Sequence, residues 1–323
     1  DISNNDYFRD ISDAAIFVNC FNYYRDISIY NIMNFLKCNI GIRIHGSNMH
    51  AVNISNNIFD NSNFIETSTG QYHNTAITVQ MPLTSYRSIN RDIEILENII
   101  TNYRIGIHAF NTPGITIGSK PSLTAKNIIN FNQTSITDYH HGIWVQNSNG
   151  AKVQDNEIHQ TSTATPSGSY TVEGITIDNC KNAVLTSNEL YELYSPIRLK
   201  GSCIGTELHC NTMDNSIYES GNGVNMDGAD VSQQGVDNVG TNLDETWDNE
   251  WIGYSSSVNG IVGLPAQPVI WFYDPLLING NPFPEAGAAF ADDLTPNSPD
   301  GCTLNLIPTV YERDSQTGTI AED

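Results

Sequence analysis

The sequence is poor in charged residues, above all in basic ones. Only 15% of its 323 residues are charged, and 14 Lys and Arg stand against 36 Asp and Glu, a formal net charge of -22. Such a chain repels phosphate backbones and anionic membranes, so nucleic acid is not an expected partner. The sequence also lacks any run of about 18 apolar residues, so we expect no membrane insertion.

Two further features are missing. The six cysteines form no CxxC pair, which argues against a zinc ribbon or a thioredoxin-type site. The chain begins with Asp1 rather than Met and shows no signal peptide, so we expect a mature or trimmed part of a longer precursor. Low Lys content, acidity and Asn-rich turns favour a secreted, extracellular or cell-surface protein.

A short alternating segment recurs along the first two thirds of the chain. Each copy has apolar side chains at its second and fourth places, and this period of two puts them on one face of a β-strand. We call these the GIxI strands. They are AIFVN (15–19), GIRIH (41–45), AITVQ (76–80), GIHAF (106–110), GIWVQ (142–146), GITID (174–178), PIRLK (196–200) and GVNMD (223–227).

A second alternating segment follows most GIxI strands and ends in asparagine, with an apolar residue two places further on. These asparagines are Asn57, Asn98, Asn156, Asn188 and Asn211. Their spacing varies while the local pattern is constant, as expected for a solenoid with loops inserted at tolerant corners. We therefore predict an all-β solenoid whose coils each hold three short parallel strands, stacked about 4.8 Å apart. The asparagines are predicted to bond the next coil from inside the corner.

With this pattern the sequence resembles the pectin-lyase-like superfamily of right-handed parallel β-helix proteins, including those of secreted bacterial type. The resemblance covers residues 1–235 and implies a right-handed, single-stranded parallel β-helix. It also implies that the GIxI strands form the face that carries substrate in the family's enzymes. Residues 236–323 lack the repeat and hold Pro-punctuated apolar runs, so we predict an irregular, β-rich C-terminal extension that packs on or caps the helix.

The third and fifth places of the GIxI strands are predicted to point outward. In the central coils they include His108, Phe110, Trp144, Gln146 and Arg198. Aromatic rings bordered by amides and charges suit sugars, which stack on such rings and form hydrogen bonds at their edges. These five residues are therefore the candidate ligand-binding surface, with a glycan as the expected ligand.

The alternative is that these residues are covered. The long segments 58–75, 81–92 and 160–173 flank the strands. If they folded over this face, Trp144 would simply be buried. Exposed apolar patches tend to be functional, so the sequence leaves both interpretations open.

Catalysis is the competing function. The segment IRLKGS is similar to the Arg-x-Lys element of polygalacturonases through Arg198 and Lys200. The segment HHGI is weakly similar to their Gly-His-Gly element through His141 and Gly142. The carboxylate elements of that family, Asn-Thr-Asp and Asp-Asp, are absent upstream of His141. This departure argues against polygalacturonase chemistry.

A second catalytic interpretation uses Asp178, Arg198, Lys200 and Asp227, as in a polysaccharide lyase or glycoside hydrolase. Asp178 and Asp227 occupy fifth places two coils apart, about 9.6 Å, which is the outer limit for an inverting pair of carboxylates. The simpler interpretation is a cross-coil ion-pair ladder of Asp178, Lys200 and Asp227.

Calcium is the one cofactor for which the sequence offers a candidate segment. Residues 225–250 are rich in Asp with Gly turns, but they contain neither an EF-hand loop nor a repeated Gly-Asp nonapeptide. We interpret them as a solvated acidic loop and expect no metal site.

The cysteines leave several arrangements open. Cys180 and Cys203 lie at similar places in adjacent coils, where a disulfide could form between stacked turns. Pairing of Cys203 with Cys210, or of Cys20 with Cys38, is the rival, and buried free thiols are equally compatible with the sequence. Cys302 would then be free or tie down the C-terminal extension.

Together these features favour a non-catalytic, secreted or cell-surface module, such as an adhesin or a matrix or filament element. Its expected partners are a glycan or a matrix component, neighbouring domains of a longer chain, or further copies of itself. Polysaccharide lyase or glycoside hydrolase activity is the alternative.

Overall fold

The computed structural model describes residues 2–3, 7–11, 13–20, 25–32, 34–47, 49–62, 74–82, 92–119, 126–132, 139–161, 171–216, 222–232, 234, 249–253, 261–264, 270–273 and 289–292. In this part of the chain the regular elements are all β-strands, and none of it forms a helix suited to spanning a membrane.

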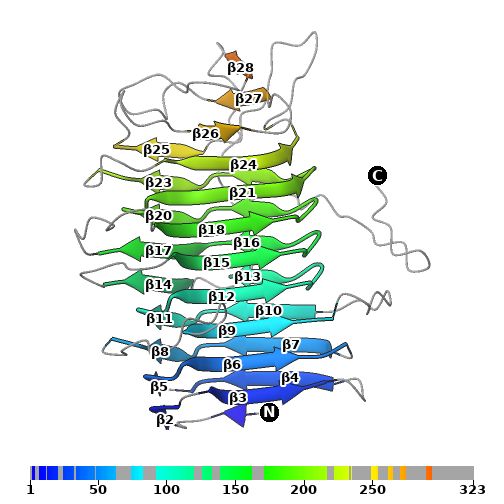
Figure 1. The fold of residues 1–323 in the computed structure, drawn as a ribbon, viewed down its shortest axis with the longest axis vertical. Coiled ribbons are helices and arrows are strands. Elements are labelled where there is room, and N and C mark those ends of the chain that lie inside the picture. The colour runs from blue at the N-terminus through cyan, green and yellow to red at the C-terminus, as the bar shows by residue number, and fades with distance from the viewer. Residues whose placement is uncertain are drawn as a thin grey trace.

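Three long sheets, all of them parallel, run the length of the molecule (Figure 1). The first sheet holds the GIxI strands: β3 (Ala14–Asn19), β6 (Ile40–His45), β9 (Thr75–Gln80), β12 (Ile105–Phe110), β15 (His140–Gln146), β18 (Val172–Asp178), β21 (Ser195–Cys203), β24 (Val224–Val231) and β26 (Ile261–Leu264). The second holds β1 (Ile2–Ser3), β4 (Arg25–Tyr30), β7 (Met49–Ser55), β10 (Asp92–Leu96), β13 (Thr116–Gly118), β16 (Lys152–Gln154), β19 (Val184–Thr186) and β22 (Glu207–His209).

The third sheet completes each coil. Its strands are β2 (Tyr7–Arg9), β5 (Asn34–Leu36), β8 (Ile58–Asp60), β11 (Ile99–Thr101), β14 (Asn127–Phe131), β17 (Asn156–Gln160), β20 (Glu189–Tyr191), β23 (Thr212–Asp214) and β25 (Glu250–Ile252). From β3 to β24 the chain visits the first, second and third sheets in turn, so every strand pairs with its counterpart one coil away. This is the parallel β-helix that the sequence predicts.

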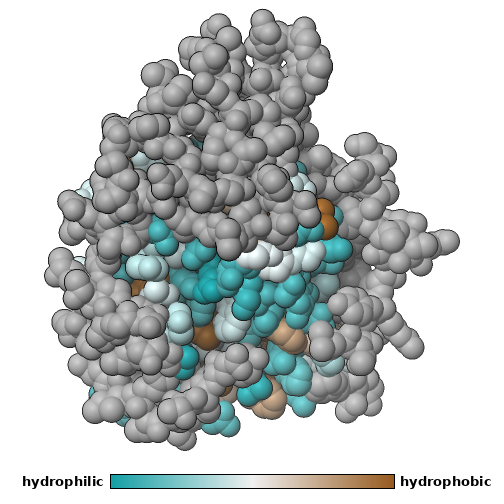
Figure 2. Space-filling model, turned by 45° about the horizontal axis from the view of Figure 1, so that its top comes forward, coloured by the Kyte–Doolittle hydropathy of each residue, from teal (hydrophilic) through white to brown (hydrophobic). Residues whose placement is uncertain are grey.

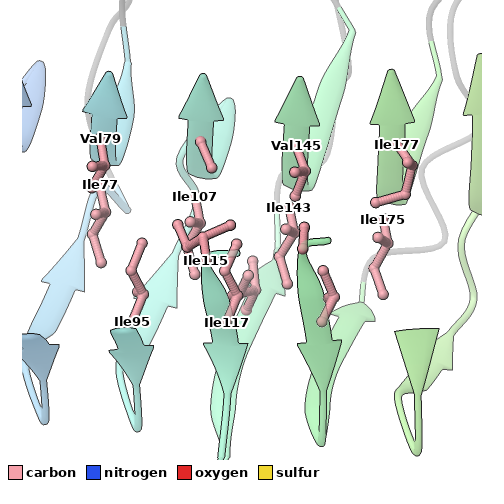
Figure 3. Close-up of a cluster of buried hydrophobic side chains, with 14 of the residues drawn as sticks. Ile77, Val79, Ile95, Ile107, Ile115, Ile117, Ile143, Val145, Ile175 and Ile177 are labelled. Carbon is pink, nitrogen blue, oxygen red and sulfur yellow. The ribbon is translucent and has the colours of Figure 1, made fainter. Parts of the chain in front are cut away.

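The core lies between the sheets and is made of the predicted inward residues. Ile143 and Val145 of β15 are completely buried, as are Ile175 and Ile177 one coil further on. In Figure 3 such side chains of the first sheet point toward the second sheet, where Ile117 is labelled. Each buried side chain of this size contributes about 1.5–3 kcal/mol, so the stacked aliphatic columns are the main stabilising feature.

Five of the eight GIxI strands begin with glycine, and at Gly106 and Gly142 the close approach of neighbouring coils leaves no room for a side chain. A Cβ on Gly142 would lie 2.7 Å from the carbonyl oxygen of Gly174 and 2.8 Å from a methyl carbon of Ile158. A Cβ on Gly106 would lie 2.5 Å from the carbonyl oxygen of Gly142. Larger residues would force the coils apart at this place.

The predicted asparagine column is present inside the corner between the second and third sheets. Its described members are Asn57, Asn98, Asn127, Asn156, Asn188, Asn211 and Asn249, of which Asn127 and Asn249 were not predicted. From Asn57 to Asn211, each Nδ2 donates to the Oδ1 of the next asparagine at 2.8–3.1 Å. The Nδ2 of every asparagine in the column also donates to a backbone carbonyl of the preceding coil. Buried amides are thus paired along the axis, as burial demands.

The corner itself depends on a left-handed backbone conformation just before the asparagine. The residue preceding each of the five predicted asparagines has a φ between 52° and 59°. These residues are Asn56, Glu97, Asp155, Ser187 and Cys210. Only two of the five are of the types that favour this conformation, Asn and Asp. The remaining three are held there by the bonding of the corner.

The parallel sheets continue past the predicted boundary at residue 235. Strand β25 pairs with β23 in the third sheet, and β26 pairs with β24 in the first. Beyond them, β27 (Ile270–Tyr273) and β28 (Ala289–Asp292) pair with each other in parallel. Most of the predicted extension, including Cys302, lies outside the described residues.

The predicted disulfide between Cys180 and Cys203 is wrong. Both residues are buried and form no disulfide, and the same holds for Cys20 and Cys38, so the pairings Cys203–Cys210 and Cys20–Cys38 fail as well. The Cys180 thiol points inward and donates to the backbone carbonyls of Val145 and Asp178 rather than toward a second sulfur. Cys210 is disulfide-bonded, to a partner outside the described part of the chain.

Candidate functional site

The outward residues of the first sheet stack in the register that the sequence predicts. The third places pair in the order Phe17, Arg43, Thr78, His108, Trp144, Thr176, Arg198, Asn225. The fifth places pair in the order Asn19, His45, Gln80, Phe110, Gln146, Asp178, Lys200, Asp227. All five predicted ligand-binding residues therefore lie on one face, within strands β12, β15 and β21.

Burial varies strongly along this face. Phe17, near one end, is 56% exposed, whereas His108 is 2% and Thr176 is 3% exposed. Trp144, between these two, is partly buried by the described residues. The segments predicted to fold over the face lie largely outside the described residues. In the view of Figure 2 the described surface is mainly hydrophilic, with scattered hydrophobic residues.

Trp144 is the centre of an aromatic strip. Its ring lies 4.8 Å from the ring of His108 and 4.9 Å from that of His141, the second pair being stacked at an interplanar angle of 23°. The ring of Phe110 follows at 6.3 Å from His108. The indole Nε1–H is buried and has no hydrogen-bond partner among the described residues. The strip thus combines a flat apolar surface with an unused donor.

A charged network borders the strip on the next coils. Glu173 of β18 accepts from Thr176 Oγ1 at 2.7 Å and lies 3.1 Å from Nδ1 of His141. It also forms an ion pair with one terminal nitrogen of Arg198. The other terminal nitrogen of Arg198 binds Asp227 of β24 at 2.6 Å. A single guanidinium therefore joins two carboxylates across three coils.

The pKa values follow from this arrangement. Burial alone would raise the pKa of Glu173, but its bond to His141 and the charges of His141 and Arg198 outweigh burial and hold the pKa at about 2. Burial lowers the pKa of His108 to about 4, and His141 acts in the same direction. Burial would lower the pKa of Arg198, but Glu173 and Asp227 raise it. At neutral pH, Glu173 and Arg198 are charged and His108 is not.

The predicted ladder of Asp178, Lys200 and Asp227 is not formed. The three residues do stack in one column, but Asp227 pairs with Arg198 instead. Asp178 is 4% exposed and accepts from the side-chain amides of Gln146 at 3.2 Å and Asn179 at 2.7 Å. Lys200 is exposed and makes no ion pair within the described chain. The longer reach of the arginine decides which cation Asp227 receives.

Glu173 is the main residue that the sequence analysis missed, and the network role of His141 was not foreseen. Both lie directly before the glycine of a GIxI strand, in adjacent coils, and pair with each other in register. Polar or charged residues at this place in two successive coils, HHGI and VEGI, are a signal that could have revealed them.

Metal binding has no support in the described residues, which contain no group of three or more His, Cys, Asp or Glu side chains suited to a metal ion. The acidic segment considered for calcium, residues 225–250, is described only at its two ends. No step of the chemistry discussed below involves a metal.

Comparison of the chain with protein-family models, with curated proteins and with solved structures finds no match. The resemblance to the pectin-lyase-like superfamily therefore remains an expectation from the sequence pattern. What is established is the class of architecture, an all-β parallel β-helix solenoid with a mixed aromatic and charged face.

Proposed function

We propose that the protein is a non-catalytic β-helix module that binds glycans on the outward face of its first sheet, around Trp144. The observation that carries the proposal is the ring of Trp144, which is stacked on the ring of His141 and in tilted contact with that of His108, on an outward column of the first sheet. Outward aromatic residues that border polar groups are typical of carbohydrate sites, because a sugar ring offers both apolar C–H faces and hydroxyl edges.

The polar surroundings support the same function. The Nε1–H of Trp144 can donate a hydrogen bond to a ligand oxygen, since no described residue accepts from it. Gln146 and Arg198 lie in neighbouring places on the same face. The solenoid holds these groups on paired strands rather than on loops, and such rigid placement favours a preorganised binding surface.

The state of the carboxylates argues against glycoside hydrolysis. A glycosidase needs a general acid whose pKa is raised toward neutrality. Glu173 has the opposite shift, to about 2. Asp178 and Asp227 are held by amides and by Arg198, respectively. For a lyase, Arg198 or Lys200 would serve as base, and the two carboxylate partners of Arg198 raise its pKa, which makes Arg198 a poorer base.

The composition supports an extracellular setting, in which this module would act as a secreted or cell-surface adhesin, or as a matrix or filament element of a bacterial protein. Parallel solenoids present long regular surfaces, which suit contacts with extended polymers and with neighbouring domains. The resemblance to the pectin-lyase-like superfamily points the same way and forms part of the proposal.

The test is a panel of oligosaccharides titrated into the wild type and into Trp144→Ala, with soluble products measured in parallel. We expect at least about tenfold weaker binding in Trp144→Ala, since loss of a stacking aromatic ring at a hot spot costs about 2 kcal/mol or more. No products are expected from either protein.

Phe17→Ala is the matched control, because Phe17 is an outward aromatic residue of the same column, several coils away, and is 56% exposed. Its binding should equal that of the wild type. Release of products by the wild type that is lost in Lys200→Ala would overturn the module proposal in favour of an enzyme.

A further inference from the structure

We infer that the Trp144 site selects neutral sugars and discriminates against uronic acids and other anionic sugars. This inference rests on the proposed glycan-binding function and adds the chemical class of the ligand. It follows from the geometry of three side chains on this face. Arg198 carries a positive charge, and the carboxylates of Glu173 and Asp227 both bind it.

Arg198 is the cation nearest to Trp144 in their column, two coils away with Thr176 between them. Arg43, the other arginine of the column, lies three coils away on the opposite side. Arginine recognises a ligand carboxylate through parallel N–H donors of its guanidinium. Here one terminal nitrogen binds Glu173 and the other binds Asp227. To bind both terminal nitrogens in this way, a ligand carboxylate would have to displace Glu173 and Asp227, and Glu173, whose side chain is 3% exposed, cannot leave without a large rearrangement.

The remaining charge on this face also opposes an anion. Strands β12, β15, β18, β21 and β24 carry four carboxylates, those of Glu173, Asp178, Asp227 and Asp230, against two cations, Arg198 and Lys200. Lys200, the second cation, stacks directly between Asp178 and Asp227. The whole chain has a formal charge of -22, so its long-range field repels anions as well.

A neutral sugar meets none of these obstacles. Its hydroxyl groups can accept from the unused Nε1–H of Trp144 and donate to the outer oxygens of Asp227, whose side chain is 48% exposed. The Nε–H of Arg198 is likewise buried without a hydrogen-bond partner in the described chain, and it is a donor to an uncharged oxygen that leaves both ion pairs in place. A hydroxyl therefore suits the site better than a carboxylate.

The experiment compares matched oligosaccharides that differ only in oxidation at C6, in calorimetric titrations at low salt. Cello-oligosaccharides are paired with oligoglucuronates, and galacto-oligosaccharides with oligogalacturonates of the same linkage. In the wild type we expect the neutral member of the bound pair to bind at least about tenfold more tightly, because like charges at an interface strongly disfavour a partner. Asp227→Asn should release one edge of Arg198 and raise uronate affinity by about tenfold or more, so that the preference for the neutral member falls or reverses.

Asp230→Asn is the control, since it makes the same change in net charge on the same strand, and Asp230 forms no ion pair in the described structure. It should leave the preference nearly unchanged. Uronates that bind the wild type as tightly as their neutral partners would overturn the selectivity while leaving glycan binding intact. Failure of every neutral and acidic member to bind would instead overturn the proposed function itself.

Discussion

The asparagine column and the outward face of the first sheet are both rows of polar side chains stacked in register, yet they are built in opposite ways. In the column every described coil from Asn57 to Asn249 repeats one residue, and each amide bonds the next. On the outward face the residue type changes from coil to coil, and the Nε1–H of Trp144 has no partner in the described part of the chain.

This difference separates stability from specificity. Repetition with complete pairing lowers the free energy of the fold at every coil but offers nothing to a ligand, because its donors and acceptors are used and buried. The outward face of the first sheet, whose residues differ from coil to coil, contributes less to the stability of the fold. Its aromatic surface and its donor without a partner among the described residues can instead bind a ligand. Substitutions in the two rows should therefore have distinct consequences for the free energy of unfolding and for binding.

The largest effect is expected from Asn156→Ala, in the middle of the column. Asn156 donates to Ile117 O, Gln154 O and Asn188 Oδ1, and accepts from Asn127. Its removal leaves several buried polar groups unpaired at roughly 1–3 kcal/mol each, so we expect a loss of about 4 kcal/mol in the free energy of unfolding. Urea denaturation measures it.

The control for this substitution is Asn149→Ala, at an exposed asparagine that accepts one bond, from the backbone of Lys181. It should cost less than about 1 kcal/mol. Equal losses in the two variants would show that the column is no more important than a surface turn.

Much of the repeating part of this comparison could be predicted from the sequence. The period of two fixed the eight GIxI strands and their register, and Asn57 to Asn211 marked the corner, because one local pattern recurs in every coil. The features that the sequence did not yield depend on single side chains. The choice of Arg198 over Lys200 by Asp227 depends on reach, and the inward direction of the Cys180 thiol depends on the turn.

The second effect is the pH dependence contributed by Glu173, on the outward face. Its pKa is about 2 in the folded protein against an ordinary 4.5. Because the folded value is lowered, this stabilisation is complete above pH 4.5 and is lost as the pH falls toward 2 and below. By linkage it amounts to roughly 3 kcal/mol. Glu173→Gln should therefore reduce the change in unfolding free energy between pH 6 and pH 2.5 by roughly 2–3 kcal/mol.

Urea denaturation at the two pH values measures this effect. Asp230→Asn, at a carboxylate of the same face without an ion pair in the described residues, should leave the pH dependence close to that of the wild type. If Glu173→Gln behaved like Asp230→Asn, the network of Glu173 with His141 and Arg198 would contribute nothing to stability.

A smaller loss is expected from Gly142→Ala, which tests the packing beneath the same face. The new Cβ would lie 2.7 Å from the carbonyl oxygen of Gly174, so the coils must shift, at a cost of about 1–3 kcal/mol. Gly150→Ala is the informative partner, because its φ is +67° but nothing lies within 4 Å of the added atom. It should cost only about 1–2 kcal/mol, for the left-handed conformation alone. Thermal unfolding with sugar titration would show whether the shift at Gly142 also weakens binding at Trp144.

The smallest effect is expected from Cys180→Ser, in the turn that follows the first sheet. The inward place of this turn is occupied by Thr112, Ser148 and Cys180 in successive coils, and Ser148 N–H donates to the Cys180 sulfur at 3.2 Å. A serine oxygen can accept the same bond, so the free energy of unfolding should change by less than about 1 kcal/mol.

Labelling of thiols in urea without reductant should modify Cys180 and Cys203 in the wild type, since both are free. A large loss in Cys180→Ser, or protection of both thiols from labelling, would mean that this corner is cross-linked and not, like the asparagine corner, a hydrogen-bonded stack.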